Sequence, residues 1–370
     1  MNKNDLHFMR LALELAGKGR GRTSPNPCVG AVIVNDGRIV GQGYHLQAGT
    51  PHAEVHAIAA ADGRTAGATL YVTLEPCNHT GRTPPCTEAI LQAGIARVVV
   101  GMKDPNPSVA GGGCALLAEK GVAVAAGILE EECRDLNRPF IKHSASGMPW
   151  VVMKAGMSLD ARISYRLGQG GRITGVRAGR ITHQLRNWLD GVLIGIDTAI
   201  IDNPSLTCRL EEKSARDPLR IILDTHLRLP PGSKLLRQQS DSPTWIFCGP
   251  DAPAGNERIL AGAGAVIHKV RTGRNNRLDL REVLTILGRA DITSVLVEGG
   301  AGIHASMLAQ NLVDEVYLFI APFFIGDQGP SLLSGFSHGE GNGHKRLRNV
   351  EVLQLGEDAM VHGIMADSGS

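Results

Sequence analysis

The sequence has no marked excess of charge of one sign. Lysine and arginine together number 38 and aspartate and glutamate 36, which leaves a formal net charge of +2. A protein that binds duplex nucleic acid carries a basic surface, so this balance disfavours that function class. Aromatic residues make up only 4% of the chain, which argues against stacking platforms for single strands. We therefore expect a small-molecule substrate and no nucleic-acid partner.

Long apolar runs are also missing. No run reaches the ~18 consecutive apolar residues of a membrane span. The N-terminal segment MNKNDLHFMRLALELAGKGR mixes charged with apolar positions and has no cleavage site of a signal peptide. The seven cysteines are an odd number, and without a secretory signal they predict reduced thiols, used for metal binding or catalysis before disulfides. These features predict a cytoplasmic protein that does not contact a membrane.

The length and composition favour a folded, multidomain chain. With 370 residues, two domains are the first expectation and three remain an alternative. Apolar residues make up 43% and charged residues 20%, close to the soluble average, so wholesale disorder is excluded. There is no internal repeat and no low-complexity tract.

Hydrophobic periodicity predicts alternating helices and strands in the first part of the chain. Apolar residues at helical spacing predict a helix over 4–18, and the turn Asn35-Asp36-Gly37 between two apolar runs predicts a hairpin over 28–43. Further helices are expected at 53–61, 88–93 and 115–120, and strands at 69–74, 97–101 and 122–125. This alternation predicts an α/β sheet covered on both faces.

A second α/β pattern follows a segment of small, turn-forming residues at 143–149, which we interpret as a domain boundary. We therefore expect one domain over 1–145 and a second over 149–370. Predicted helices of the second domain lie at 179–189 and 303–308, and predicted strands at 150–153, 192–196, 219–223, 244–248, 294–297, 315–320 and 351–355.

One group of residues carries recognisable metal chemistry. His52, Cys77 and Cys86 offer one imidazole and two thiols near the starts of two predicted helices. Three nitrogen and sulfur ligands with one open position are typical of catalytic zinc, whereas structural zinc usually has four ligands. Glu54 lies two residues after His52 and is placed to shuttle a proton. Since zinc makes hydroxide available at neutral pH, this group predicts hydrolytic deamination of an amino-substituted heterocycle.

The spacing of the two cysteines narrows the substrate class. The zinc-deaminase signature is H-x-E followed by P-C-x-x-C, but here eight residues separate Cys77 from Cys86. The editing deaminases that act on nucleic acids use the short form, so this departure disfavours a nucleic-acid substrate. For His56 and for the remaining cysteines we expect structural roles in packing; these are Cys28, Cys114, Cys133, Cys208 and Cys248.

Several motifs together resemble the bifunctional deaminase/reductase of bacterial riboflavin biosynthesis, and the resemblance runs essentially end to end. In the first domain they are Asn26-Pro27-x-Val29-Gly30, His52-Ala53-Glu54-Val55, Thr73-Leu74-Glu75-Pro76-Cys77, Gly81-Arg82-Thr83-Pro84-Pro85-Cys86 and Asp104-Pro105-Asn106-Pro107. In the second they are Lys154-Ala155-Gly156-Met157-Ser158-Leu159-Asp160, Ile173-Thr174, Asp202-Asn203-Pro204-x-Leu206-Thr207-x-Arg209 and the loop from Val297 to Gly302.

The resemblance implies a cytidine-deaminase-like three-layer domain followed by a dihydrofolate-reductase-like domain that uses NADPH. It also implies the substrate, 2,5-diamino-6-ribosylamino-4(3H)-pyrimidinone 5′-phosphate, which loses its 2-amino group as ammonia. The second domain then reduces the ribosyl to a ribityl chain, giving 5-amino-6-(5-phosphoribitylamino)uracil. A homo-oligomer is the family expectation.

The same resemblance assigns residues to these tasks. In the deaminase pocket it places Asn26, His45, His79, Arg82, Asp104 and Asn106. Toward the reductase substrate it places Lys154, Gly170, Arg186, Leu206, Arg209 and Glu298. Toward the dinucleotide it places Ala155, Arg172, Thr198, Asp202, Thr225, Gly300, Ala301, Gly302, Ile303, His304, Ala305 and Ser306. Lys154 and Asp202 are the candidates for the general acid of the reduction.

Two loops of the second domain differ from common sequence patterns. The glycine-rich turn after Val297 is not the G-x-G-x-x-G of a Rossmann fold, although glycines and a helix N-terminus suit a phosphate. The family often has Ser-x-Trp-Ile-Thr where this chain has Gly170-Gly171-Arg172-Ile173-Thr174. Either Arg172 stacks on or pairs with the cofactor, or the loop is altered and NADPH binds more weakly. The glycine-rich stretch 335–343 is expected to be a surface loop.

Two rival functions remain at this stage. One is a deaminase of nucleosides or RNA whose C-terminal half is a binding appendage, which the charge, the few aromatics and the cysteine spacing oppose. The other is a structural zinc module joined to a nucleotide-sensing domain, which needs a fourth protein ligand and no role for Glu54.

Overall fold

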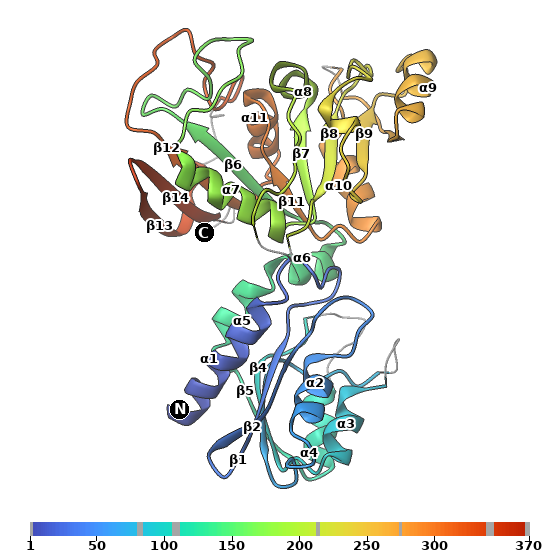
Figure 1. The fold of residues 1–370 in the computed structure, drawn as a ribbon, viewed down its shortest axis with the longest axis vertical. Helices are drawn as coiled ribbons and strands as arrows, with labels where there is room; N and C mark the ends of the chain where they lie inside the picture. Colours follow the sequence, from blue (N-terminus) through green and yellow to red (C-terminus); the bar gives the residue numbers. More distant parts are fainter. Residues whose placement is uncertain are drawn as a thin grey trace. The chain divides into compact units, whose positions relative to one another are not determined.

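The computed structural model describes residues 3–79, 84–105, 112–211, 215–273, 276–337 and 344–366. The chain divides into two compact units, Met1–Gly147 and Met148–Ser370. Each unit is an α/β structure built on its own sheet (Figure 1). The α/β class predicted from the alternation of patterns is therefore confirmed for both.

In the first unit, five described strands form a sheet in the order β2-β1-β3-β4-β5. The hairpin strands run antiparallel, β1 also pairs antiparallel with β3, and β3, β4 and β5 are parallel. The strands are β1 (Gly30–Asn35), β2 (Arg38–Tyr44), β3 (Thr69–Leu74), β4 (Arg97–Met102) and β5 (Ala123–Ala126). The helices are α1 (Lys3–Gly17), α2 (Ala53–Ala60), α3 (Cys86–Gln92), α4 (Gly113–Glu119), α5 (Glu130–Leu136) and α6 (Arg138–Ser146).

Helices cover both faces of this sheet, which makes three layers. Helices α1 and α5 lie on one face, and α2, α3 and α4 lie on the other (Figure 1). Strands β1, β3 and β4 are buried along almost their whole length, as continuous apolar strands covered on both faces must be. The loops after β3 and β4 and the starts of α2 and α3 carry the side chains of the first candidate site.

In the second unit, nine described strands form one sheet in the order β10-β9-β8-β7-β11-β6-β12-β14-β13. The strands from β10 to β12 are parallel, and β14 and β13 complete the edge antiparallel. The strands are β6 (Trp150–Met157), β7 (Gly191–Gly195), β8 (Leu219–Leu223), β9 (Thr244–Cys248), β10 (Ala265–Lys269), β11 (Ser294–Val297), β12 (Glu315–Ile320), β13 (Leu347–Leu355) and β14 (Asp358–Met365). The helices are α7 (Val176–Trp188), α8 (Ile196–Asp202), the short 3₁₀ helix η1 (Lys234–Leu236), α9 (Ala254–Gly262), α10 (Leu280–Arg289) and α11 (Ala301–Ala309).

The parallel strands separate two apolar cores. Along β7, Val192 and Ile194 join the core under α7 and α9, whereas Leu193 between them joins the core under α10 and α11. This follows from the two-residue period of a strand, whose successive side chains point to opposite faces. Because β6, β11, β7 and β8 run parallel, their carboxyl ends lie along one edge of the sheet. Open α/β sheets bind ligands at this edge.

Some sequence expectations need correction. The sequence analysis places residues 143–146 in a turn-forming boundary, but they form the last turn of α6. The helix ends at Ser146, and Gly147 follows it in a left-handed conformation. Helices α5, α8, α9 and α10 and strands β10 and β14 were not anticipated. The predicted strand over 351–355 is confirmed as part of β13, which lies at the edge of the sheet. Residues 338–343 of the glycine-rich stretch lie outside the described residues. None of the helices that the structure describes combines the length and apolarity required to span a bilayer.

Candidate active sites

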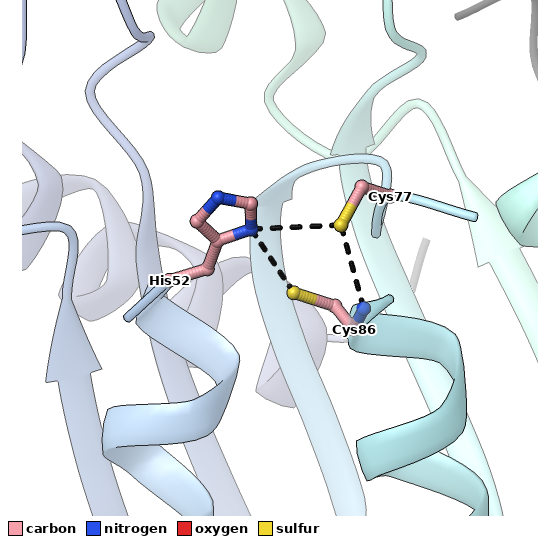
Figure 2. A group of neighbouring side chains, drawn as sticks. All are labelled: His52, Cys77 and Cys86. Carbon is pink, nitrogen blue, oxygen red and sulfur yellow. Dashed lines mark hydrogen bonds between the residues drawn. The ribbon is translucent and has the colours of Figure 1, made fainter. Parts of the chain in front are cut away.

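The three predicted zinc ligands come from three separate segments of the first unit. His52 is the residue that caps the N-terminus of α2, and its own side chain makes no capping hydrogen bond. Cys86 is the first residue of α3, and Cys77 lies in the loop that follows β3. Figure 2 shows the imidazole and the two sulfur atoms pointing toward one another. Two helix N-termini therefore face the group, and their positive ends favour thiolates there.

The distances within this group fit a zinc ion. His52 Nδ1 lies 3.2 Å from Cys86 Sγ and 3.5 Å from Cys77 Sγ, and the three ligand atoms all lie within 4.8 Å of one another. Bond lengths of ~2.0 Å to nitrogen and ~2.3 Å to sulfur in a tetrahedron require a nitrogen–sulfur separation of about 3.5 Å. In the described part of the chain, three side chains make up this group, which leaves one tetrahedral position open.

The two thiols titrate as a pair. A hydrogen bond from the Cys86 thiol lowers the pKa of Cys77 to about 4, and the same contact raises the pKa of Cys86. The backbone N–H of Cys86 also donates to Cys77 Sγ over 3.4 Å. Without a cation the pair thus carries one negative charge and one proton. A divalent cation displaces that proton, because a coordinating thiol is deprotonated outright.

Glu54 lies beside the metal group in the first turn of α2 and is only 3% exposed. Burial raises the pKa of its carboxyl above the usual range, although the charge on His52 opposes this. Burial makes this carboxylate a stronger base than an exposed one. Glu54 thus lies beside the metal group, where the sequence analysis expects a proton shuttle.

Two residues to which the sequence analysis gave no role hold the Cys77 loop in place. Glu75 is buried, and its two carboxylate oxygens accept from the backbone N–H groups of Cys114 and Asp104 at 3.0 and 3.2 Å. A Cβ on Gly113 would lie 1.9 Å from the carbonyl oxygen of Pro76, so only glycine permits this approach of α4. The signal available in the sequence was a carboxylate directly after a buried strand.

The other residues expected in the deaminase pocket are placed unevenly. Asn26 Nδ2 lies 3.1 Å from His45 Nε2, while His45 Nδ1 lies 3.2 Å from the carbonyl oxygen of Pro51 and the His45 ring packs edge-on against His52. Burial lowers the pKa of His45, which favours the neutral form of the ring, and the contact with Asn26 lets this ring orient the Asn26 amide. His79 is exposed and Asp104 half-buried.

Two further predictions in this pocket, Arg82 and Asn106, lie outside the described residues. His56, expected to be structural, lies in α2 with a buried Nε2 that has no hydrogen-bond partner.

In the second unit, a cavity of about 730 Å³ lies at the carboxyl edge of the parallel strands. Its wall includes Lys154 from β6, the loop before α7, the start of α8 and the first turns of α11. Of the residues predicted for this site, the cavity is lined by Lys154, Ala155, Gly170, Arg172, Thr198, Asp202, Thr225, Glu298, Gly300, Ala301, Gly302, Ile303, His304 and Ser306. Residues more than 140 positions apart in the sequence, such as Lys154 and Ser306, thus line the same cavity.

Four predicted residues do not line the cavity. Arg186 forms a buried two-point ion pair with Glu298, with its Nε 2.5 Å and its Nη2 2.9 Å from the carboxylate oxygens. Leu206 and Ala305 are buried, the first in the core beneath α7. Arg209 is exposed, and its backbone N–H donates to His183. The Arg186–Glu298 pair supports the cavity floor, because Glu298 itself reaches the cavity.

Lys154 and Asp202 differ in their surroundings. Lys154 is half-buried, and burial lowers the pKa of its ammonium, which the charge of Glu298 partly restores. Burial raises the pKa of Asp202 at the end of α8. A Cβ on Gly170 would lie 2.1 Å from Asp202 Oδ1, so glycine at 170 is required for this carboxylate to reach the cavity.

Arg172 curls back on its own loop. Its Nε donates to the carbonyl oxygen of Thr174 and its Nη2 to that of Gly175, directly before α7. A Cβ on Gly179 would lie 2.2 Å from Nη2. The guanidinium still lines the cavity, so it both shapes the loop and presents a cation there.

The two sites together define a class: a bifunctional enzyme in which a zinc-dependent deaminase unit precedes a reductase unit. The family model described as "Cytidine and deoxycytidylate deaminase zinc-binding region" matches residues 2–102, and the one described as "RibD C-terminal domain" matches residues 149–361. The riboflavin biosynthesis protein RibD of Bacillus amyloliquefaciens is 41% identical over 98% of this chain and 96% of its own length. That of Escherichia coli is 37% identical over 97% and 98%.

Solved structures agree over the whole chain. RibD of Acinetobacter baumannii is 36% identical and superposes with a TM-score of 0.88, covering 99% of both chains. A diaminohydroxyphosphoribosylaminopyrimidine deaminase/5-amino-6-(5-phosphoribosylamino)uracil reductase of Thermotoga maritima is 36% identical, with a TM-score of 0.84, and covers 98% of this chain and 99% of its own.

The chain belongs to the RibD family and is a bifunctional deaminase and reductase of riboflavin biosynthesis. The predicted deaminase-like and dihydrofolate-reductase-like folds are confirmed, and so are the zinc and NADPH cofactors, which these two domains fit. Its substrate is a small molecule, as predicted. The rival functions of an RNA deaminase and a structural zinc module are set aside.

Proposed function

We propose that residues 1–145 carry the deamination, with His52, Cys77 and Cys86 as the zinc ligands and Glu54 as the proton shuttle. The observation that carries this proposal is the convergence of the three ligand atoms within 4.8 Å beside a buried carboxyl of raised pKa. The compact unit Met1–Gly147 supports the boundary. The proposed substrate is 2,5-diamino-6-ribosylamino-4(3H)-pyrimidinone 5′-phosphate, which the name of the Thermotoga maritima relative supports.

The chain's own groups would act in a simple order. Zinc, when bound, supplies a nucleophile from water at neutral pH. Glu54 would take a proton from the attacking water and pass it to the neighbouring ring nitrogen of the pyrimidinone. It would then move the remaining hydroxyl proton to the 2-amino group, which leaves as ammonia while the C2 carbonyl forms. The amide of Asn26, oriented by His45, reads a polar edge of the pyrimidinone. His79, Arg82, Asp104 and Asn106 complete the pocket in this proposal, with Arg82 suited to the phosphate.

The test of this site is Glu54→Gln, which preserves shape and removes the titrating group. We expect zinc content to be retained and ammonia release to fall by roughly 10²- to 10⁴-fold, the usual contribution of a general acid–base. Glu88→Gln is the matched control, since Glu88 lies two residues after Cys86 as Glu54 does after His52, but is exposed. Full ammonia release by a zinc-loaded Glu54→Gln protein would contradict the proposal.

We further propose that residues 149–370 carry the reduction of the ribosyl to the ribityl chain, in the cavity at the carboxyl edge of the sheet. NADPH, when bound, supplies the hydride. Lys154, held next to Glu298, donates the proton to the sugar ring oxygen as the ring opens, while Asp202 lies closer to the loop at Gly170. The residues that position the substrate in this proposal are Glu298, Arg186, Leu206 and Arg209.

In this proposal the dinucleotide would be held by other residues of the same cavity. Gly300, Ala301 and Gly302 at the start of α11 offer backbone N–H groups to the pyrophosphate. The remaining residues proposed to bind NADPH are Ala155, Arg172, Thr198, Asp202, Thr225, Ile303, His304, Ala305 and Ser306. We infer that the enzyme works in the cytoplasm as a homo-oligomer; its reduced cysteines support the compartment and family membership supports the assembly.

A further inference from the structure

The cavity of the second unit has a cationic end at Arg277, a residue to which neither proposed reaction gives a role. Arg277, in the loop before α10, lines the cavity together with Thr225 after β8 and with Ser306 and Gln310 at α11. Three separate segments of the unit therefore place polar groups around the same end. Arg277 has no role in the sequence analysis or in the proposed function.

The loop that carries Arg277 is tied down on both sides. Its carbonyl oxygen accepts from the backbone N–H of Gly273 over 2.8 Å, and the neighbouring Leu278 pairs with Thr272 in a β-bridge and is buried. The guanidinium itself is exposed, and its Nη1 lies 3.3 Å from Ser306 Oγ. Because Ser306 donates its own proton to the carbonyl oxygen of Gly302, it accepts from Arg277.

Arg277 differs from the other described cations of this wall in what neutralises it. The charge of Glu298 acts on Lys154, and Arg172 donates to two backbone carbonyl oxygens. Among the residues that the structure describes, the ion pairs include no carboxylate partner for Arg277. A fork of guanidinium donors beside a serine and a threonine hydroxyl suits a phosphate monoester.

The position of this end relative to α11 identifies the phosphate. The pyrophosphate of the dinucleotide is proposed to lie at the N-terminus of α11, at Gly300. Ser306 lies six residues further along the same helix, and the charges that act on Lys154, where the reduction is proposed, are Glu298, Arg186 and Arg172 and do not include Arg277. We therefore assign a group bound at Arg277 to the adenosine half of the cofactor, away from the nicotinamide. NADPH differs from NADH in that half by a single 2′-phosphate, which carries about −1.5 to −2 charges at neutral pH.

We propose that Arg277, with Ser306 and Thr225, binds the 2′-phosphate of NADPH and sets the preference for NADPH over NADH. The inference rests on the proposed reductase function, since it assigns the binding site of that cofactor. Arg277 is a specificity residue here and takes no part in hydride or proton transfer.

The test measures binding to the full chain without turnover. NADP⁺ and NAD⁺, and adenosine 2′,5′-bisphosphate and AMP, are titrated by calorimetry as two pairs that differ only in the 2′-phosphate. Arg277→Gln is expected to weaken NADP⁺ and the bisphosphate by roughly 10- to 100-fold, as loss of a charged hydrogen bond does, and to leave NAD⁺ and AMP unchanged. Arg277→Lys should retain part of the preference, and Arg258→Gln, an exposed arginine on α9, should retain all of it.

The outcomes separate this inference from the function on which it rests. If wild-type protein prefers NADP⁺ and Arg277→Gln keeps the same ratio of NADP⁺ to NAD⁺ affinities, Arg277 is not the determinant and the reductase assignment stands. A wild-type protein that binds the two dinucleotides equally also overturns the inference. If the wild-type protein binds neither dinucleotide, the proposed cofactor site itself is wrong, and the inference falls with it.

Discussion

At the scale of single residues, burial decides which groups can move protons. Glu54 and Lys154 are ordinary side chains whose surroundings shift their pKa values in opposite directions, Glu54 upward and Lys154 downward, and burial is the largest cause in both cases. In each case burial disfavours the charged form, which makes the Glu54 carboxylate a stronger base and the Lys154 ammonium a stronger acid. One fold thus provides two different proton carriers, one in each unit.

Lys154→Met tests the second of these groups, because it keeps the apolar stem and removes the ammonium. Reduction of the deaminated substrate is expected to slow by roughly 10²- to 10⁴-fold, with NADP⁺ affinity and ammonia release unchanged. Stopped-flow oxidation of NADPH measures the rate. Asp202→Asn is the comparison: should that variant lose the reduction while Lys154→Met retains it, the roles of the two residues are reversed.

At the scale of elements, the metal site depends on how closely neighbouring segments approach. Helix α4 packs against the Pro76 carbonyl through Gly113, and Glu75 joins the loop after β3 to the start of α4 and to the loop after β4. These contacts leave Cys77 little freedom to move away from His52. A preformed ligand geometry of this kind raises metal affinity, because the protein loses less conformational entropy when the metal binds.

Gly113→Ala is expected to disturb that arrangement. The new Cβ would lie 1.9 Å from the Pro76 carbonyl oxygen, so the loop must shift, at a cost of about 1–3 kcal/mol. Zinc affinity, measured by competition with a coloured chelator, should fall roughly tenfold or more. Gly17→Ala is the control, because a Cβ there meets nothing within 4 Å. Equal zinc affinities of the two variants would show that the Gly113 contact does not position Cys77.

The junction of α1 with the sheet gives a pH-dependent prediction. Arg97 on β4 donates two hydrogen bonds to the buried carboxylate of Asp5, at 2.8 and 2.9 Å, and Tyr71 donates a third. The hydrogen bonds from Arg97 are the first cause that lowers the pKa of Asp5 below its ordinary value of 3.8. A lowered folded-state pKa stabilises the protein above pH 3.8, and this contribution is lost as the pH falls through the folded-state value.

We therefore expect Asp5→Asn to lower the stability of the first unit by roughly 1–3 kcal/mol at pH 7, with the difference from wild type shrinking below about pH 4. Urea unfolding followed by circular dichroism measures the change. All three tryptophans lie in the second unit, so tryptophan fluorescence supplies an internal control that should not change. A difference of the same size at pH 3 would mean that charge is not its source.

At the scale of the whole molecule, the metal group and the cavity belong to two different compact units. The residues of the metal group are His52, Cys77 and Cys86 of the first unit, and the described residues that line the cavity all belong to the second. The two reactions are consecutive, because the reductase acts on what the deaminase produces. Their chemistry is nonetheless separable, since the first depends on the metal group and the second on the dinucleotide.

Zinc removal should therefore stop one reaction and not the other. Dialysis against a chelator is expected to abolish ammonia release from the diaminopyrimidinone phosphate and to leave NADPH-dependent reduction of the deaminated substrate intact. Both are followed in the same protein sample, before and after zinc is restored. If reduction is also lost while the chain remains folded by circular dichroism, the two sites are coupled and the separation is wrong.

The sequence by itself predicts much of the fold and of the metal site, because both depend on short-range patterns. Local periodicity and turn residues predict helices that start near His52 and Cys86, the strand before Cys77, the hairpin over 28–43 and the alternation of helices and strands. Motifs as specific as His52-Ala53-Glu54 with Pro76-Cys77 determine the reaction class as well, since zinc chemistry constrains which residue types can serve.

Other features were decided only by the tertiary structure. The ion pair of Arg186 with Glu298 joins residues 112 positions apart, and the Glu75 carboxylate accepts from backbone N–H groups 29 and 39 positions away. Arg277 reaches the cavity only because its loop returns to α11. Such contacts depend on the order of strands in a parallel sheet, and the side-chain period of a strand does not encode which strand lies beside it.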